Sequence, residues 1–164
     1  MIKITQAHTK KDFNNIEDLA NIIWNEHYIP IIGKQQVDYM LDKFQSAAAM
    51  ADQVSNGVKY YMIEHDDSLV GYFSFSVHEE HLFLSKLYVI SSERGNGIGR
   101  KSLSFIERQT KDVKLNKIQL TVNKYNTNSI EAYEKMGFQN IDAIVQDIGQ
   151  GYVMDDFVFE KVID

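Results

Sequence analysis

Residues 82–109 read LFLSKLYVISSERGNGIGRKSLSFIERQ, and this stretch decides the fold. It begins with a mostly apolar run of strand length, continues through a short polar turn, and then places glycines at alternate positions, at Gly95, Gly97 and Gly99. The residues after the turn have the apolar periodicity of a helix. The stretch therefore predicts a strand, a glycine turn and a helix, in that order.

The glycine turn indicates an anion-binding site. Glycine loses more backbone freedom on folding than any other residue, so three glycines in five residues are costly. At the N-terminus of a helix, such a turn can direct unpaired backbone N–H groups toward an anion, which the helix dipole also attracts. Seven Lys or Arg residues and two acidic residues lie in 94–117, a net charge of +5 in a chain of net charge −6. This local positive charge favours a polyanionic ligand.

Spacing distinguishes three phosphate-binding motifs at the turn. A dinucleotide fingerprint G-x-G-x-x-G that begins at Gly95 needs a glycine where the chain has Arg100. A P-loop that begins at Gly95 would use Lys101 and Ser102, but its second glycine also falls on Arg100. The pattern [QR]-x-x-G-x-[GA] does fit, as residues 94–99. The alternative interpretation is an ordinary glycine-rich turn without a ligand.

A second motif favours the ligand-binding interpretation. Residues 126–138 read NTNSIEAYEKMGF and match N-x-x-[AS]-x-x-x-Y-x-x-x-G-F. With both motifs present in this order, the chain resembles the GNAT superfamily of N-acetyltransferases from about Tyr60 to its C-terminus. The resemblance implies that acetyl-CoA is the cosubstrate, that the turn amides hold its pyrophosphate, and that the acetyl group passes to a primary amine.

The periodicity of the whole chain predicts a single N-acetyltransferase domain over residues 1–164. Strands are expected at 2–6, 58–64, 69–78, 82–90, 117–122, 141–148 and 152–163. Helices are expected from Thr9 to about His27, over 37–54, from Ile98 onward and over 126–136. The order β-α-α-β-β-β-α-β-α-β-β is that of the superfamily. The resemblance implies an α+β, three-layer fold whose mostly antiparallel sheet splays between its fourth and fifth strands.

The resemblance also assigns the cofactor contacts. The backbone of Leu87, Tyr88 and Val89 would pair with the pantetheine arm and polarise the acetyl carbonyl. The second motif would add Asn126 and Lys135, although Asn126 also suits a helix cap and Lys135 a solvated surface. The turn would supply the remaining cofactor-binding residues, which are Arg94, Gly95, Asn96, Gly97, Ile98, Gly99 and Arg100.

Acetyl transfer also needs proton transfers, because the amine loses a proton and the leaving thiolate gains one. By resemblance Tyr133 is the general acid, and the competing interpretation is that its ring only packs. Glu26 is the named candidate for the acceptor side, where it would attract a cation or accept a proton. No spacing rule separates it from the other candidates near the acceptor, which are His27, Tyr28, His78, Glu79, Glu80 and His81.

Composition excludes several classes of site and protein. The chain has no cysteine, which excludes disulfides, a cysteine nucleophile and an acyl-thioester intermediate, so transfer would be direct. The pair His78-x-x-His81 has no third ligand at a recognisable spacing, so no metal is expected. No apolar run has the length of a transmembrane helix or the form of a signal peptide, which predicts a cytoplasmic protein without a membrane partner.

The net charge outside residues 94–117 indicates the kind of acceptor. Outside residues 94–117 the chain carries −11, which suits a cationic acceptor. The C-terminal segment 152–161 and the second helix resemble bacterial polyamine-type acetyltransferases, so a polyamine is the expected acceptor, with peptide, protein N-terminal or lysine amines as the alternative. A non-catalytic acyl-CoA-binding module and a homodimer both stay open. The pI of about 5.3 argues against nucleic-acid binding.

Overall fold

The computed structural model describes residues 1–164, except for the side chain of Lys86. Its elements in chain order are β1 (Ile2–Gln6), α1 (Lys10–Ile32), α2 (Lys34–Gln45), α3 (Ala47–Ser55), β2 (Lys59–His65), β3 (Ser68–Val77), β4 (Leu82–Val89), the 3-10 turn η1 (Ser91–Glu93), α4 (Ile98–Asp112), β5 (Lys117–Asn123), α5 (Thr127–Lys135), β6 (Gln139–Gly149) and β7 (Tyr152–Val162).

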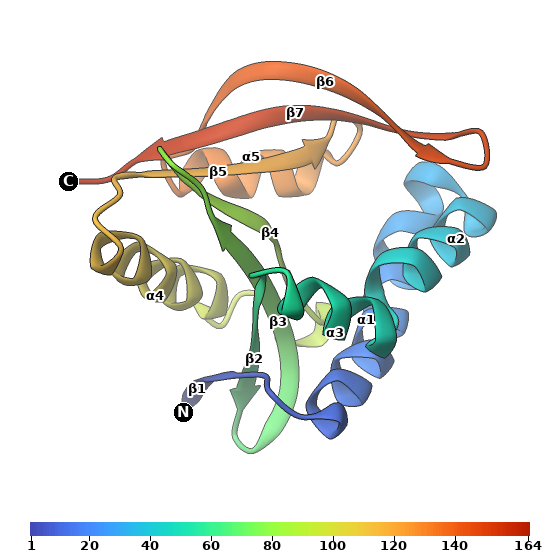
Figure 1. Ribbon diagram of the computed structural model, residues 1–164, viewed down its shortest axis with the longest axis horizontal. Coiled ribbons are helices and arrows are strands. Elements are labelled where there is room, and N and C mark those ends of the chain that lie inside the picture. Colours follow the sequence, from blue (N-terminus) through green and yellow to red (C-terminus); the bar gives the residue numbers. More distant parts are fainter.

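The strands form one sheet of seven, in the order β1-β2-β3-β4-β5-β7-β6. Every neighbouring pair is antiparallel except β4 and β5, which the intervening helix α4 connects as a parallel crossover. These two strands pair only at Leu82 with Ile118 and at Phe83 with Gln119. Beyond these residues they diverge, and the β1–β4 half of the sheet stands at an angle to the β5–β7 half (Figure 1). The predicted splay is confirmed.

A β-bulge interrupts β4 next to the splay. Phe73 of β3 pairs with Leu87, whereas Phe75 pairs with Leu84, so Ser74 faces two residues of β4. A bulge leaves one residue out of the ladder and turns the strand that carries it. After the bulge, the edge of β4 that faces the splay has no strand partner from Leu87 onward.

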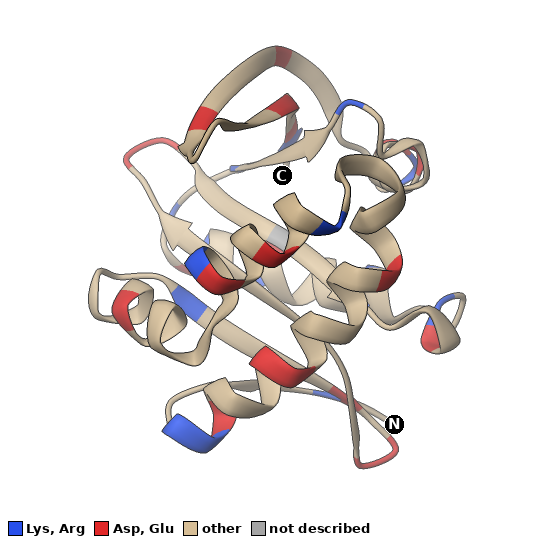
Figure 2. Ribbon diagram, turned by 90° about the vertical axis from the view of Figure 1, so that its right-hand side faces the viewer, with Lys and Arg blue, Asp and Glu red and all other residues tan. Residues whose placement is uncertain are grey.

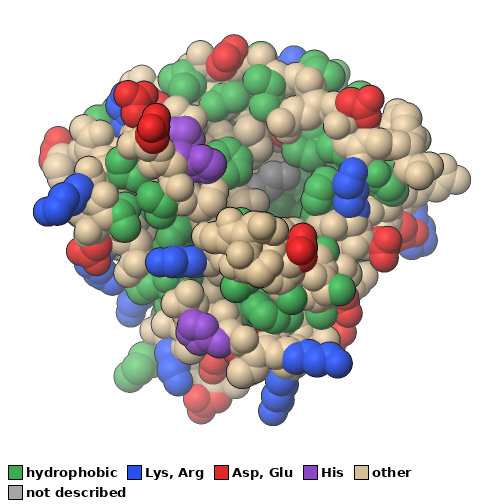
Figure 3. Space-filling view, in the orientation of Figure 1, with side chains coloured by type: hydrophobic (Ala, Val, Ile, Leu, Met, Phe, Trp, Pro, Cys, Tyr) green, Lys and Arg blue, Asp and Glu red, His purple; other side chains and the backbone are tan. Residues whose placement is uncertain are grey.

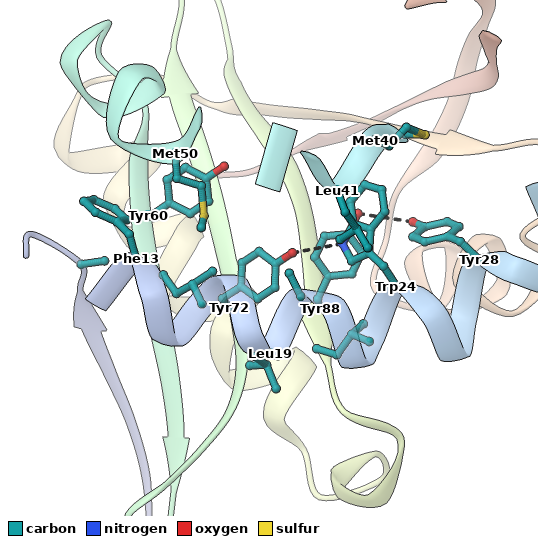
Figure 4. Close-up of a cluster of buried hydrophobic side chains, with 14 of the residues drawn as sticks. Phe13, Leu19, Trp24, Tyr28, Met40, Leu41, Met50, Tyr60, Tyr72 and Tyr88 are labelled. Carbon is teal, nitrogen blue, oxygen red and sulfur yellow. Dashed lines mark hydrogen bonds between the residues drawn. The ribbon is translucent and has the colours of Figure 1, made fainter. Parts of the chain in front are cut away.

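Helices cover both faces of the sheet, as the predicted three-layer fold requires. On one face α1, α2 and α3 enclose an aromatic-rich core that includes Trp24, Tyr60 and Tyr72 (Figure 4). On the other face α4 and α5 enclose a second core around Phe73, with branched aliphatic residues of β4, β5 and α4. In Figure 1 the first three helices lie on one side of β3 and β4, and α4 lies on the other side.

The structure corrects two helix boundaries. The apolar spacing predicts a first helix that ends near His27, but α1 continues through Pro30 to Ile32. Proline lies in the last turn, and the helix then ends where the Gly33 N–H donates to the Ile29 carbonyl at 2.9 Å. Gly33 has φ +84°, a backbone conformation that favours glycine.

The second predicted helix, 37–54, is two helices that meet at Ser46. Ser46 has an extended backbone, and its hydroxyl accepts from the Ala49 N–H at 3.1 Å. The Glu17 carboxylate of α1 accepts from the Ala47 N–H at 2.7 Å. Both groups satisfy donors at the start of α3 that a break would otherwise leave unpaired. The apolar periodicity continues across the break, which is why the pattern indicated one helix.

Candidate active site

A cavity of about 560 Å³ opens where β4 and β5 diverge. The last residues of β4 form one wall, and α1 contributes Ile23, His27 and Tyr28 to another. The glycine turn and the start of α4 close one end, and α5 closes the side that faces β5. The surface is hollowed here, with hydrophobic side chains around the depression, in the space-filling view (Figure 3).

The glycine turn has the geometry of an anion site. Gly97 is the N-cap of α4 and has φ +76°, and Gly95 has φ +86°. A β-carbon built at Gly95, Gly97 or Gly99 would meet no atom within 4 Å, so these three positions face open space. No side chain caps the N-terminus of α4. The first amides of this helix therefore remain available to a ligand, and Arg94 and Arg100 line the same end of the cavity.

Tyr133 of α5 lines the cavity, as does its electrostatic neighbour Tyr28 of α1. Only 8% of Tyr133 is exposed, and its hydroxyl accepts a hydrogen bond from the Leu87 backbone N–H. Burial, and secondarily the neighbouring Tyr28, raise the pKa of this hydroxyl well above its ordinary value, and the Leu87 hydrogen bond only partly opposes the shift. At neutral pH the phenol is therefore protonated and can donate. The Tyr133 hydroxyl, a proton donor, therefore lies next to the edge of β4 that has no strand partner.

Two further tyrosines lie at the α1 wall. The hydroxyls of Tyr28 and Tyr88 are 3.4 Å apart and both residues line the cavity. Behind them, Trp24 donates its indole N–H to the Tyr72 hydroxyl at 3.1 Å (Figure 4). Tyr72 in turn donates to Gln45 at 2.5 Å. The α1 wall is therefore aromatic, and hydrogen bonds connect the side chains behind it.

These buried phenols predict a loss of stability at alkaline pH. Burial raises the pKa of Tyr72, Tyr88 and Tyr133, whereas tyrosine in an unfolded chain titrates near about 10. Above that pH the unfolded chain releases protons that the native state keeps, so the free energy of unfolding should fall as pH rises. Urea unfolding at pH 8 and pH 11 measures this. Tyr72→Phe should reduce the dependence, and equal stability of the wild type at both pH values would contradict it.

The cavity brings together most of the residues predicted for cofactor binding. Lining it are Leu87, Tyr88, Val89, Arg94, Gly95, Gly97, Ile98, Gly99, Arg100, Asn126, Tyr133 and Lys135. Asn126 also caps α5, because its side chain accepts from the Ser129 N–H at 3.3 Å. Asn96 does not line the cavity, and its amide instead donates to the Glu93 carboxylate at 3.0 Å.

Only some of the acceptor-side candidates line the cavity. His27 and Tyr28 line the cavity, whereas the neighbouring Glu26 does not and accepts a hydrogen bond from Ser91 at 3.1 Å. His78 and His81 stack on each other in the β3–β4 turn with ring centroids 5.0 Å apart, away from the cavity lining. Within the described part of the chain, no group of three or more His, Cys, Asp or Glu side chains is placed to hold a metal.

The sequence interpretation missed two residues beside the turn. Glu93 lines the cavity and its carboxylate lies 2.8 Å from Nδ1 of His65, at the end of β2. The contact joins residues 28 positions apart in the chain, and neither belongs to a motif, so no local pattern could have paired them.

None of the helices in the described residues is long and apolar enough to cross a membrane. No curated protein matches the chain. Among solved structures, the PaiA N-acetyltransferase from Thermoplasma acidophilum, in complex with coenzyme A, is similar with a TM-score of 0.84 and 20% identity over 99% of each chain.

Two further solved structures share the fold. The ribosomal-protein-S18-alanine N-acetyltransferase from Escherichia coli has a TM-score of 0.70 and 15% identity, over 100% of this chain and 95% of that one. A GNAT family acetyltransferase from Elizabethkingia anophelis with acetyl-CoA bound has a TM-score of 0.62 and 13% identity, over 99% and 98%. The model of the acetyltransferase (GNAT) family matches residues 16–138, three quarters of the chain, and the chain belongs to this family of N-acetyltransferases.

Proposed function

We propose that the protein transfers an acetyl group from acetyl-CoA directly to a primary amine of a small cationic, polyamine-like acceptor. The observation that carries the proposal is one continuous cavity that joins an uncapped, glycine-rich helix N-terminus to a buried tyrosine hydroxyl. The first is suited to phosphate and the second to a leaving thiolate. Solved structures with the same fold hold coenzyme A or acetyl-CoA, which supports the choice of cosubstrate.

Different walls of the cavity would bind different parts of the cosubstrate. The amides at the start of α4, with Arg94 and Arg100, would hold the pyrophosphate of the cosubstrate. The edge of β4 after the bulge, which has no strand partner, would pair with the amides of the pantetheine arm. Backbone N–H groups of this edge would also stabilise the negative charge that develops on the acetyl oxygen, which is a large catalytic contribution in acyl transfer.

Tyr133 would supply the proton for the leaving group. The amine nitrogen forms its bond to the acetyl carbon, the carbon–sulfur bond breaks, and the thiolate takes the phenolic proton. The Tyr133 phenolate then regains a proton from solvent. The phenol is protonated at neutral pH, as an ordinary tyrosine is, and its raised pKa makes it a weak acid, so its proton would pass to the thiolate only within hydrogen-bond reach. The amine enters as an ammonium and loses one proton before attack and one after it, to solvent or to a base on the acceptor side. His27 lines this side of the cavity, and the neighbouring Glu26 lies outside the lining, where it accepts a hydrogen bond from Ser91.

The charge of the acceptor side supports a cationic amine. Residues 10–55, which form α1 to α3, contain seven acidic and four basic residues, and Figure 2 looks onto these helices. An acidic surface attracts a polycation over distances of about 10 Å at moderate salt. A peptide amine is the alternative acceptor within the same chemistry.

The experiment is a survey of acceptors with acetyl-CoA, in which thiol release and product mass are both followed. Polyamines, free amino acids, aminoglycosides and peptides with defined N-termini form the panel. The proposal predicts an increase in mass of one acetyl group on a polyamine, with one thiol released per product. Acetylation of peptides alone would refute the polyamine acceptor and retain the acetyl-transfer reaction. Binding of acetyl-CoA without turnover on any amine would indicate a binding module.

A further inference from the structure

Two side chains attach the turn to the rest of the molecule: Ser91 donates to Glu26 of α1, and the half-buried Glu93 reaches the sheet. Within 91–97, Glu93 is the only residue that is not exposed, and its neighbours on both sides are open to solvent. Backbone hydrogen bonds in η1, from Glu93 N–H to Ile90 and from Arg94 N–H to Ser91, are local to the turn. They shape the turn but do not attach it to the rest of the molecule.

The Glu93 carboxylate makes two contacts through the same oxygen, Oε2. His65 Nδ1 lies 2.8 Å from it, and the Asn96 amide donates to it at 3.0 Å. His65 is the last residue of β2, which is hydrogen-bonded on both sides, to β1 and to β3. Asn96 is within the glycine motif, between Gly95 and Gly97. The carboxylate therefore joins a strand that is paired on both sides to the middle of the glycine turn.

The end of β2 makes two further contacts. Asp66, next to His65, pairs with the N-terminal ammonium of Met1 at 2.6 Å and lies 3.6 Å from His65 Nε2. The hydrogen bond with His65 is the largest influence that lowers the pKa of Glu93, and Asn96 lowers it further, so the carboxylate is ionised at neutral pH. Hydrogen bonds to an ionised acceptor are stronger than neutral ones.

We infer that His65 is a positioning residue for the cosubstrate: through Glu93 and Asn96 it holds the glycine turn in the conformation that binds phosphate. The inference rests on the proposed function, because it concerns the same phosphate site. Asn96 then has a different role from the predicted one: its side chain stabilises the turn through Glu93 and does not contact the cosubstrate. A turn that is ordered before binding does not lose that conformational freedom on binding, so affinity is higher.

The inference predicts that His65→Ala raises the KM for acetyl-CoA about tenfold, equivalent to about 1.4 kcal/mol, with little change in kcat. Asn96→Ala, at an exposed position, should act in the same direction without loss of fold. Because both variants release the same carboxylate, Asn96→Ala should have a smaller effect in the His65→Ala background than in the wild type. The matched control is His8→Ala, which removes an exposed histidine after β1.

S-acetyl-pantetheine separates this role from general damage, because it carries the thioester but no phosphate. With this substrate, kcat/KM of His65→Ala should equal that of the wild type, since the turn has nothing to hold. An equal loss with both thioesters, or an unchanged KM for acetyl-CoA in folded His65→Ala and Asn96→Ala, would overturn the inference. Failure of the wild type itself to bind acetyl-CoA would instead refute the proposed function.

Discussion

Replacing Tyr133 with phenylalanine is expected to lower kcat by roughly 10²–10⁴-fold, the range for loss of a general acid, while acetyl-CoA affinity changes little. The substitution removes one hydroxyl and keeps the ring that packs against Phe138. If Tyr133 only packs, the loss is one hydrogen bond, about 1 kcal/mol of stability, with near wild-type kcat. Steady-state kinetics with the true acceptor, and calorimetry with acetyl-CoA, measure the two quantities separately.

Tyr72→Phe is the matched control for this variant. Tyr72 is also buried, its hydroxyl is hydrogen-bonded, and its pKa is raised by burial, but it does not line the cavity. It should lose stability and keep kcat. With Tyr133→Phe, thioesters of more acidic thiols should recover part of the lost rate, because such thiolates leave without a proton. A rate defect that is equal for all thioesters would indicate a structural role.

The second large effect is expected at the phosphate end. Gly97→Val should raise the dissociation constant for acetyl-CoA at least about 100-fold, because its side chain would occupy the open space in front of the turn. The loss corresponds to about two hydrogen bonds to a charged group. Isothermal titration calorimetry on the folded variant measures it. An unchanged affinity would show that the phosphates bind elsewhere.

Variants at two further glycines distinguish a loss of affinity caused by steric crowding from one caused by backbone strain. Gly97 has a positive φ, which valine adopts only with strain, whereas Gly99 has an ordinary helical φ and also faces open space. Gly99→Val should therefore weaken binding without straining the turn. Gly151, in the β6–β7 turn, has φ +79° and open space around it but no place in the cavity. Gly151→Val should reproduce the strain and leave acetyl-CoA affinity unchanged.

Local patterns predicted the parts of the fold and site that local chemistry determines. The strand–turn–helix at 82–109 and the helix at 126–136 follow from glycine positions and apolar periodicity, and the structure has both. The two motifs also predicted cavity residues on separate elements, such as Gly97 and Tyr133. Their spacing reflects the geometry of a single ligand-binding cavity.

What the sequence could not show depends on tertiary contacts. The break between α2 and α3 is stabilised by Glu17 from another helix, so periodicity alone indicated a continuous helix. Asn96 lies within the motif yet its side chain turns to Glu93, and the partner of Glu93, His65, comes from β2. Glu26 and His27 are neighbours in the chain, but helical rotation places only His27 in the cavity. Such assignments need the packed structure.

The central claim is that one cavity holds the phosphates at the glycine turn and the thioester at Tyr133. A crystal structure of the protein with coenzyme A tests it most directly. We expect pyrophosphate oxygens within hydrogen-bond distance of the backbone amides of residues 95–100, and the sulfur within about 4 Å of the Tyr133 hydroxyl. Coenzyme A bound outside this cavity, or with its sulfur directed away from Tyr133, would contradict the account.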